Sequence, residues 1–90
     1  MQQFDELQNF KVQKITDVSQ LGAIIRAYRK HQRLTLTQVS GLTRLGVRFL
    51  SELERGKPTV ELGKALYVIN ALGLDITLQP RRIKTHYQGE

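Results

Sequence analysis

Four short segments of the sequence space their apolar residues as a helix does, and only brief turns separate them. We expect helices at about residues 20–32, 36–42, 46–54 and 60–72. A helix this short gains most of its stability by packing one apolar face against its neighbours. The pattern therefore predicts one small, mainly α-helical bundle within the 90 residues.

Capping residues and helix breakers set the expected ends of these helices. Thr16, Asp17 or Ser19 can cap the first helix, Thr35 or Thr37 the second, and Thr59 the fourth. Gly56 suits a left-handed residue after the third helix, Gly73 ends the fourth, and Gly46 suits a tight turn before the third. The residues expected to face inward are Leu21, Ile24, Ile25, Tyr28, Val39, Leu42, Phe49, Leu50, Leu53, Leu62, Leu66, Ile69 and Leu72.

The segment after the fourth helix has a different period. Leu74, Ile76 and Leu78 alternate with polar residues, which predicts a half-buried strand at 74–79. A lone strand exposes unpaired N–H and C=O groups, so its partner is either Lys11–Ile15 or the same strand of a second subunit. We expect an N-terminal arm at 1–15, a helical domain at 16–73, a dimerisation strand at 74–79 and a flexible basic tail at 80–90.

The net charge of +6 is confined to one third of the chain. Residues 26–57 contain eight basic and two acidic residues, a difference of six that accounts for the whole excess. Positive charge gathered in one segment is typical of proteins that bind a polyanion, because neutralising phosphates releases condensed counterions. A solvated basic helix would show the same charge, so both interpretations stand at this point.

Several classes of function are disfavoured by what the sequence lacks. There is no cysteine, which removes disulfides, thiolate metal sites and thiol catalysis and suits a reducing cytoplasm. One histidine, His31, lies late in a helix and the other, His86, in the tail, so neither has partner ligands. We expect no enzyme, no metal and no cofactor. The sequence shows neither an apolar span nor a secretion signal, so we expect a cytoplasmic, nucleoid-associated protein.

A short helix, a brief turn and a second helix with a polar outer face are the parts of a helix-turn-helix. The run LTLTQVSGLTRLGVRFLSELERGKPT resembles the Xre/Cro type of DNA-binding domain, and RFLSELERGKPT followed by LGKALYVINALGLDI is similar to HipB-type antitoxins within it. The likeness covers about residues 19–78. It implies a lambda-repressor-like bundle of four to five helices with a short C-terminal β-strand for dimerisation.

The resemblance assigns roles to matching positions. It pairs Arg29, late in the first helix, with Glu54, at the end of the third, as a structural ion pair. Arg48 is the best base-reading candidate, because a guanidinium can donate two hydrogen bonds to guanine, while Val47 could contact a thymine methyl. Glu52 could accept a hydrogen bond from cytosine or orient Arg48. The base-reading residues implied are Gly46, Val47, Arg48, Ser51 and Glu52.

A second set is implied to contact DNA phosphates. The start of the second helix offers free backbone N–H groups and a positive dipole end. The set consists of Thr35, Leu36, Thr37, Arg44, Arg55, Lys57 and Thr59. Three positions depart from the family pattern: Leu36 replaces a polar residue, Ser40 replaces a small one, and Arg44 stands where the turn usually has glycine. The third departure predicts that the start of the third helix is shifted, and the base-reading register with it.

The resemblance implies a sequence-specific repressor of double-stranded DNA, bound as a homodimer to a palindromic operator. It also implies an antitoxin that silences its own operon and binds a HipA-like kinase toxin. A free-standing Xre-family regulator without a toxin partner is the alternative. A third hypothesis is an interaction module that does not bind DNA, in which Arg48, Ser51 and Glu52 form an ordinary solvated helix face.

Overall fold

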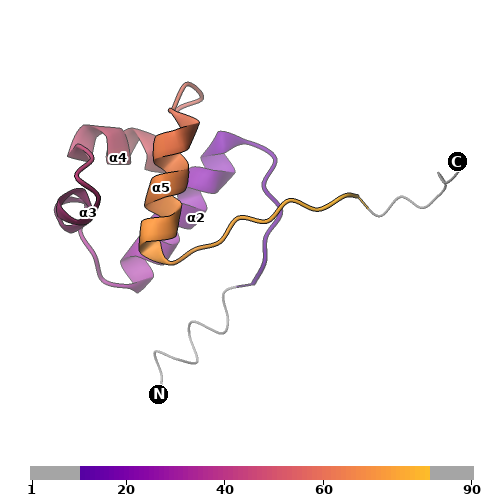
Figure 1. Ribbon diagram of the computed structural model, residues 1–90, viewed down its shortest axis with the longest axis horizontal. Helices are drawn as coiled ribbons and strands as arrows, with labels where there is room; N and C mark the ends of the chain where they lie inside the picture. The colour runs from indigo at the N-terminus through magenta and orange to yellow at the C-terminus, as the bar shows by residue number, and fades with distance from the viewer. Residues whose placement is uncertain (1–10, 82–90) are drawn as a thin grey trace, which may run out of the picture.

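The fold is a bundle of four short helices in the part of the chain that the structure describes. The structure is a computed structural model, and it describes residues 11–81. The helices are α2 at Val18–His31, α3 at Leu36–Thr43, α4 at Val47–Glu54 and α5 at Leu62–Leu72. Helix α2 contacts α4 and α5, and α3 contacts α4 and α5 (Figure 1). The predicted number and order of helices are confirmed for these residues.

Side-chain caps explain where two of the helices begin. The carboxylate of Asp17 accepts a hydrogen bond from the backbone N–H of Gln20 at 2.9 Å, which caps α2. This hydrogen bond is the main reason that the pKa of Asp17 lies below its usual value. Thr35 and Gln38 form a reciprocal capping box at the start of α3, with bonds of 2.8 and 3.0 Å. The caps at Asp17 and Thr35 were among those that the sequence predicts.

Glycines in left-handed conformation explain where two helices end. Gly56 follows α4 with φ = +80°, and Gly73 follows α5 with φ = +91°. A residue with a Cβ is strained in this region, so glycine is favoured at both positions. Both predicted helix ends are therefore confirmed.

The hydrophobic core joins all four helices. Its buried residues are Ile25, Val39, Leu50, Leu53, Ala65, Val68, Ile69 and Leu72. Leu21, Tyr28 and Phe49 pack against this core from partly buried positions. Most of the predicted core is confirmed, but Ala65 and Val68 were not predicted, and three leucines of the prediction are exposed.

The inward face of α5 differs from the prediction. The helix begins at Leu62 with Glu61 as its N-cap residue, so the predicted cap at Thr59 and start at residue 60 are wrong. Leu62 is 64% exposed and Leu66 is also exposed. The buried stripe passes instead through Ala65, Val68 and Ile69 and continues to Leu72.

Leu42 is the third error in the predicted core, and Thr43 explains it. Helix α3 buries Val39 and Thr43, which lie one turn apart, and Leu42 is left 64% exposed. The Thr43 hydroxyl donates to the Val39 carbonyl oxygen at 2.8 Å, so its polar atom is satisfied inside the core. A threonine that bonds its own helix can replace a leucine on the buried face.

The predicted strand at 74–79 is not formed in the described part of this single chain. Residues 74–81 have no strand pairing there, and neither do residues 11–16. Leu74 still packs against the core and donates its N–H to the Ile69 carbonyl at 3.0 Å, whereas Ile76 is exposed and Leu78 is 92% exposed. Residues 1–10 of the predicted arm and 82–90 of the predicted tail lie outside the described residues.

No helix within residues 11–81 is both long and apolar enough to cross a membrane.

Helices α2 and α4 meet backbone to backbone at Gly22. A Cβ placed on Gly22 would overlap the carbonyl oxygens of Leu53 and Glu54. Gly56, just beyond α4, lies equally close to the backbone of Ser19. The absence of two side chains therefore allows the first turns of α2 to lie directly on the end of α4.

We expect Gly22→Ala to lower the free energy of unfolding by about 1–3 kcal/mol, because the methyl group meets backbone atoms that cannot rotate away. The matched control is Gly41→Ala in α3, where an added Cβ has no neighbour within 4 Å. This change should instead stabilise the protein by about 0.5–1 kcal/mol through the helix preference of alanine. Urea unfolding followed by circular dichroism measures both, and equal effects would contradict the close contact.

Candidate nucleic-acid interface

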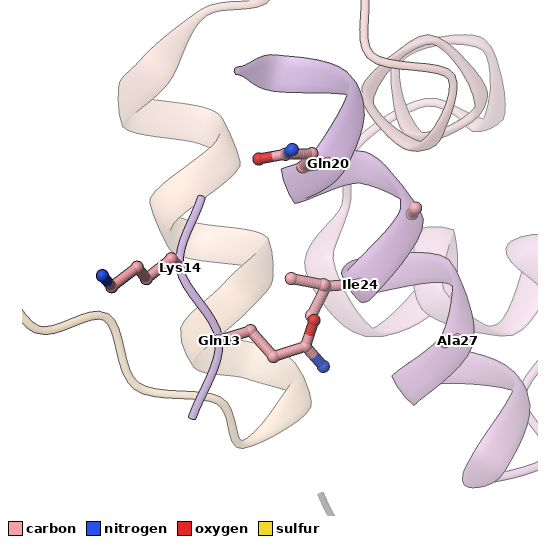
Figure 2. Close-up of a pocket in the computed structure, with 6 residues that line it drawn as sticks. Gln13, Lys14, Gln20, Ile24 and Ala27 are labelled. Atoms are coloured by element: carbon pink, nitrogen blue, oxygen red, sulfur yellow. The ribbon is translucent and has the colours of Figure 1, made fainter. Parts of the chain in front are cut away.

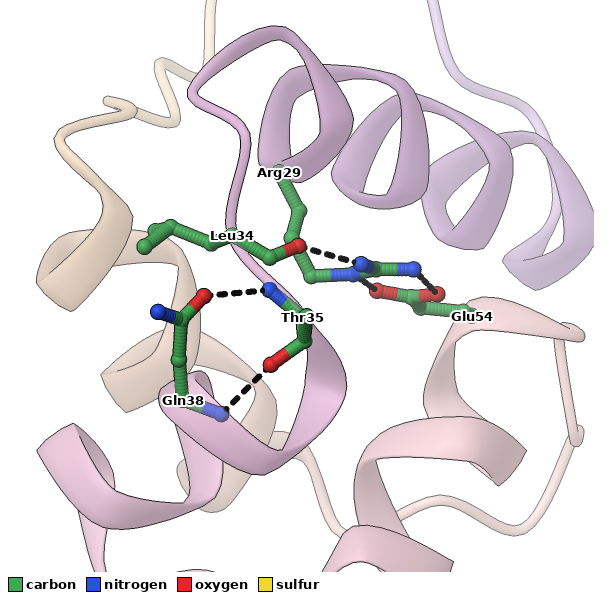
Figure 3. A network of polar contacts seen from close by, with 5 residues as sticks. All are labelled: Arg29, Leu34, Thr35, Gln38 and Glu54. Atoms are coloured by element: carbon green, nitrogen blue, oxygen red, sulfur yellow. Dashed lines mark hydrogen bonds and ion pairs between the residues drawn. The ribbon is translucent and has the colours of Figure 1, made fainter.

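A buried ion pair holds the end of α4 against α2. The Arg29 Nε donates to Glu54 Oε2 at 2.6 Å and its Nη2 donates to Glu54 Oε1 at 3.0 Å (Figure 3). The two side chains are only 9% and 7% exposed. This two-point geometry fixes orientation as well as distance, since a planar guanidinium meets both carboxylate oxygens.

Arg29 also reaches the start of α3. Its Nη1 donates to the Leu34 carbonyl oxygen at 2.6 Å, and the capping box of α3 begins at the next residue, Thr35 (Figure 3). The hydrogen bond to Glu54 is the largest cause that raises the pKa of Arg29 above its usual value. One side chain thus connects α2, α4 and the segment that starts α3. The contact with Leu34 was not predicted, because nothing in the sequence marks a backbone carbonyl as a partner.

The turn between α3 and α4 spans residues 44–46 and places its unusual backbone at Arg44. Arg44 is left-handed, with φ = +63°, whereas Gly46 has φ = −68°, which any residue can adopt. Gly46 therefore lies in the turn, as predicted, but its backbone does not require glycine, and Arg44 occupies the strained position itself. Left-handed backbone at a residue with a Cβ costs about 1–2 kcal/mol. Helix α4 begins at Val47, directly after its N-cap residue Gly46.

Polar side chains of α3 support this turn. The Ser40 hydroxyl donates to the Leu45 carbonyl oxygen at 2.6 Å, and the Leu45 N–H donates to the Thr43 hydroxyl at 3.2 Å. Ser40 departs from the family pattern, and the structure gives its reason: its hydroxyl closes the turn that Arg44 strains. The sequence showed this departure but not the bond behind it.

The outward face of α4 carries the predicted base-reading residues. Gly46, Val47 and Arg48 are exposed, and the Arg48 side chain is 91% exposed. Ser51 and Glu52 follow one turn later at partly exposed positions. The opposite face of the helix is in the core through Leu50 and Leu53. The structure therefore brings all five predicted residues onto one side of α4.

Glu52 contacts the two cations nearest to it. Its Oε2 lies 3.4 Å from Arg48 Nε and its Oε1 lies 3.2 Å from Lys57 Nζ. Chiefly through the hydrogen bond from Lys57, these contacts hold the pKa of Glu52 below its usual value. The carboxylate therefore remains charged at neutral pH.

The residues predicted to contact phosphates lie before and after α4 in the sequence. Thr35, Thr37 and Arg44 are exposed before α4, whereas Leu36 is partly buried against the core. Only the backbone N–H of Leu36 is therefore suited to an anion, and its side chain is not. Beyond α4 the exposed members of the set are Arg55, Lys57 and Thr59.

A shallow pocket lies elsewhere, between the extended segment at 11–16 and α2. Its volume is about 380 Å³, and Gln13, Lys14, Gln20 and Ile24 line it together with two alanines (Figure 2). Of its lining residues, Lys14 is the charged one. Within residues 11–81, no three His, Asp or Glu side chains gather as metal ligands would.

Comparisons with known proteins agree with this geometry. The helix-turn-helix domain family matches residues 20–81. The Uncharacterized HTH-type transcriptional regulator y4mF of Sinorhizobium fredii (strain NBRC 101917 / NGR234) is 38% identical over 65 residues, which cover 72% of this chain and 86% of that protein. The chain belongs to the helix-turn-helix family of DNA-binding transcriptional regulators, which are not enzymes.

The fold is also similar to solved structures of HipB. The HipB-O4 20mer complex and the HipA-HipB-O2-O3 complex each match with a TM-score of 0.73 over 79% of this chain and all of the HipB chain. The sequence identity is 20% in both comparisons. At this identity the likeness establishes a shared fold.

We expect Glu54→Gln to destabilise the protein by about 3–5 kcal/mol, because Arg29 is left buried without its counter-charge. The control is Glu61→Gln, which removes an equal charge from an exposed pair, with Lys64 Nζ 3.5 Å from Glu61 Oε1. That pair should contribute less than about 1 kcal/mol. Thermal and urea unfolding distinguish the two, and similar losses would show that burial does not set the strength of the Arg29–Glu54 pair.

Proposed function

We propose that this chain is a sequence-specific repressor that binds double-stranded operator DNA through the outward face of α4. The observation that carries the proposal is the position of Arg48, which is 91% exposed on a helix anchored by buried Leu50, Leu53 and Glu54. A rigid helix that presents an exposed arginine fits the major groove, where the guanidinium can bond guanine O6 and N7. Gly46, Val47 and Ser51 lie on the same face and complete the contact with the base edges.

Contacts with the DNA backbone would come from the segments before and after α4. At the N-terminus of α3, the backbone N–H groups of Leu36 and Thr37 can face an anion, whereas the Thr35 N–H is bonded to Gln38; Arg44 follows at the turn. After α4, Arg55, Lys57 and Thr59 would contact neighbouring phosphates of the DNA. Such contacts set register and orientation on the duplex, while the face of α4 supplies selectivity.

We propose further that the protein acts as a homodimer on a palindromic site. The exposed alternation of Ile76 and Leu78 in an extended segment supports this, because an unpaired apolar strand gains stability by pairing with a copy of itself. Two copies would place two α4 helices on successive major grooves, about 34 Å apart.

The protein is also proposed to be a HipB-like antitoxin that silences its own operon and binds a HipA-like kinase. The support is the ERGKPT element with its following LGKAL helix, together with a fold that matches HipB in a complex with HipA. A free-standing regulator is the second candidate, favoured by the relative named only as a transcriptional regulator. If a reading frame beside this gene encodes a kinase and that kinase co-purifies with the protein, the antitoxin is supported. If no kinase co-purifies, the free-standing regulator is supported.

We expect Arg48→Ala to lose about 1–3 kcal/mol of discrimination between a selected DNA site and unrelated DNA, the cost of one bidentate base contact. The matched control is Arg26→Ala, which removes an exposed arginine from α2. Fluorescence anisotropy with a site selected from randomised duplexes measures both affinities. Unchanged discrimination in Arg48→Ala would favour a module that does not recognise sequence.

We expect Leu78→Asp to convert the dimer to monomers, because a carboxylate replaces an apolar side chain of the pairing strand. Thr77→Asp adds the same charge on the polar side of the segment and should leave the dimer intact. Light scattering at micromolar concentration measures the mass. A monomeric wild-type protein that still binds its selected site would contradict the dimer.

A further inference from the structure

Glu52 lies between two cations to which the proposed function gives different tasks. Its Oε2 faces Arg48, the proposed base-reading residue, and its Oε1 faces Lys57, a proposed phosphate contact. Within residues 11–81, Glu52 is the acidic residue on the outward face of α4, since Glu54 is turned toward Arg29. A negative charge in a surface that faces DNA repels phosphate and so opposes binding. Its presence there has to be explained by another effect.

The geometry indicates how Glu52 acts on Arg48. The contact is made through Nε, at the stem side of the guanidinium, and it is long, at 3.4 Å. The terminal nitrogens at the other end of the group are the pair that can bond guanine O6 and N7. Glu52 therefore restricts the direction of a highly exposed side chain without occupying the donors that a base requires.

The contact with Lys57, in contrast, weakens the binding of DNA. Lys57 Nζ lies 3.2 Å from Glu52 Oε1, so part of its charge is offset before any phosphate arrives. On any DNA, Lys57 has to exchange this partner for a phosphate. The net attraction that Lys57 contributes to binding is thereby reduced equally on every sequence.

We propose that Glu52 is a positioning residue that determines specificity by orienting Arg48 toward its base, while its contact with Lys57 lowers the affinity for all DNA. The inference rests on the proposed function, because it requires α4 to face the major groove. On a matched site the two hydrogen bonds of Arg48 outweigh the repulsion between Glu52 and phosphate. The same repulsion acts on an unmatched site, so the ratio of the two affinities rises only because Arg48 is held toward its matching base.

The test uses Glu52→Gln, which keeps the length of the side chain and removes its charge. The probes are a duplex selected by the wild-type protein from randomised 20-base-pair DNA and a shuffled duplex of the same composition. We expect tighter binding to the shuffled duplex and a fall of about fivefold or more in the ratio of affinities. On the shuffled duplex, the slope of log affinity against log salt should steepen by about one unit.

Two controls separate this role from a structural one. Glu61→Gln removes an equal charge from the exposed pair with Lys64 and should leave the ratio unchanged. In the Arg48→Ala background, Glu52→Gln should no longer lower the ratio, although binding to shuffled DNA should still tighten. Thermal unfolding of Glu52→Gln should match that of the wild type within a few degrees, since both contacts lie at the surface.

Two results would overturn the inference. If Arg48→Ala lowers the ratio of affinities and Glu52→Gln leaves it unchanged, base reading stands and the role of Glu52 is refuted. If neither variant changes the ratio, the base-reading face itself is misassigned and the inference falls with the proposed function.

Discussion

The ion pair between Arg29 and Glu54 sets the direction of α4, and every proposed contact with DNA depends on that direction. Apolar packing through Leu50 and Leu53 selects the buried face of α4, but it is non-directional and does not fix one exact orientation of an eight-residue helix. Two parallel hydrogen bonds to a planar guanidinium do select one, and a third bond ties the same side chain to the carbonyl of Leu34. The pair thereby fixes α4 relative to both α2 and the start of α3.

The close approach of α2 and α4 completes this constraint. Helix α4 has no side-chain cap at its start, so its stability comes chiefly from tertiary packing. Gly22 and Gly56 allow backbone contact at its end, where the ion pair also lies. One end of the helix is therefore held tightly, and the exposed end carries Val47 and Arg48.

The turn before α4 shows that this surface is built at some expense to stability. Arg44 occupies a left-handed position that glycine would adopt without strain, and bonds from Ser40 and Thr43 stabilise the loop around it. Strain of this kind persists only where the surrounding structure holds the residue in place. A basic residue beside the proposed groove-facing helix is consistent with contact to phosphate.

Much of the fold could be predicted from the sequence, because helix periodicity, caps and breakers act locally. Asp17, Thr35, Gly56 and Gly73 marked helix ends correctly, and the apolar spacing placed four helices. The division of α4 into a core face and an outward face also followed from spacing alone, since residues on a helix advance by about 100° each. The amino-acid sequence by itself therefore determines which residues of α4 share the face of the proposed interface.

The tertiary structure decided what local patterns leave open. Leu42, Leu62 and Leu66 are exposed because packing turns other faces of α3 and α5 inward, with Thr43 buried in α3 and Ala65 buried in α5. The Arg29 contact to Leu34, the Gly22 contact to α4 and the placement of Glu52 between Arg48 and Lys57 join residues whose meeting no local pattern encodes. Sequence spacing fixes which residues share a face of one helix, whereas only packing between helices fixes what that face touches.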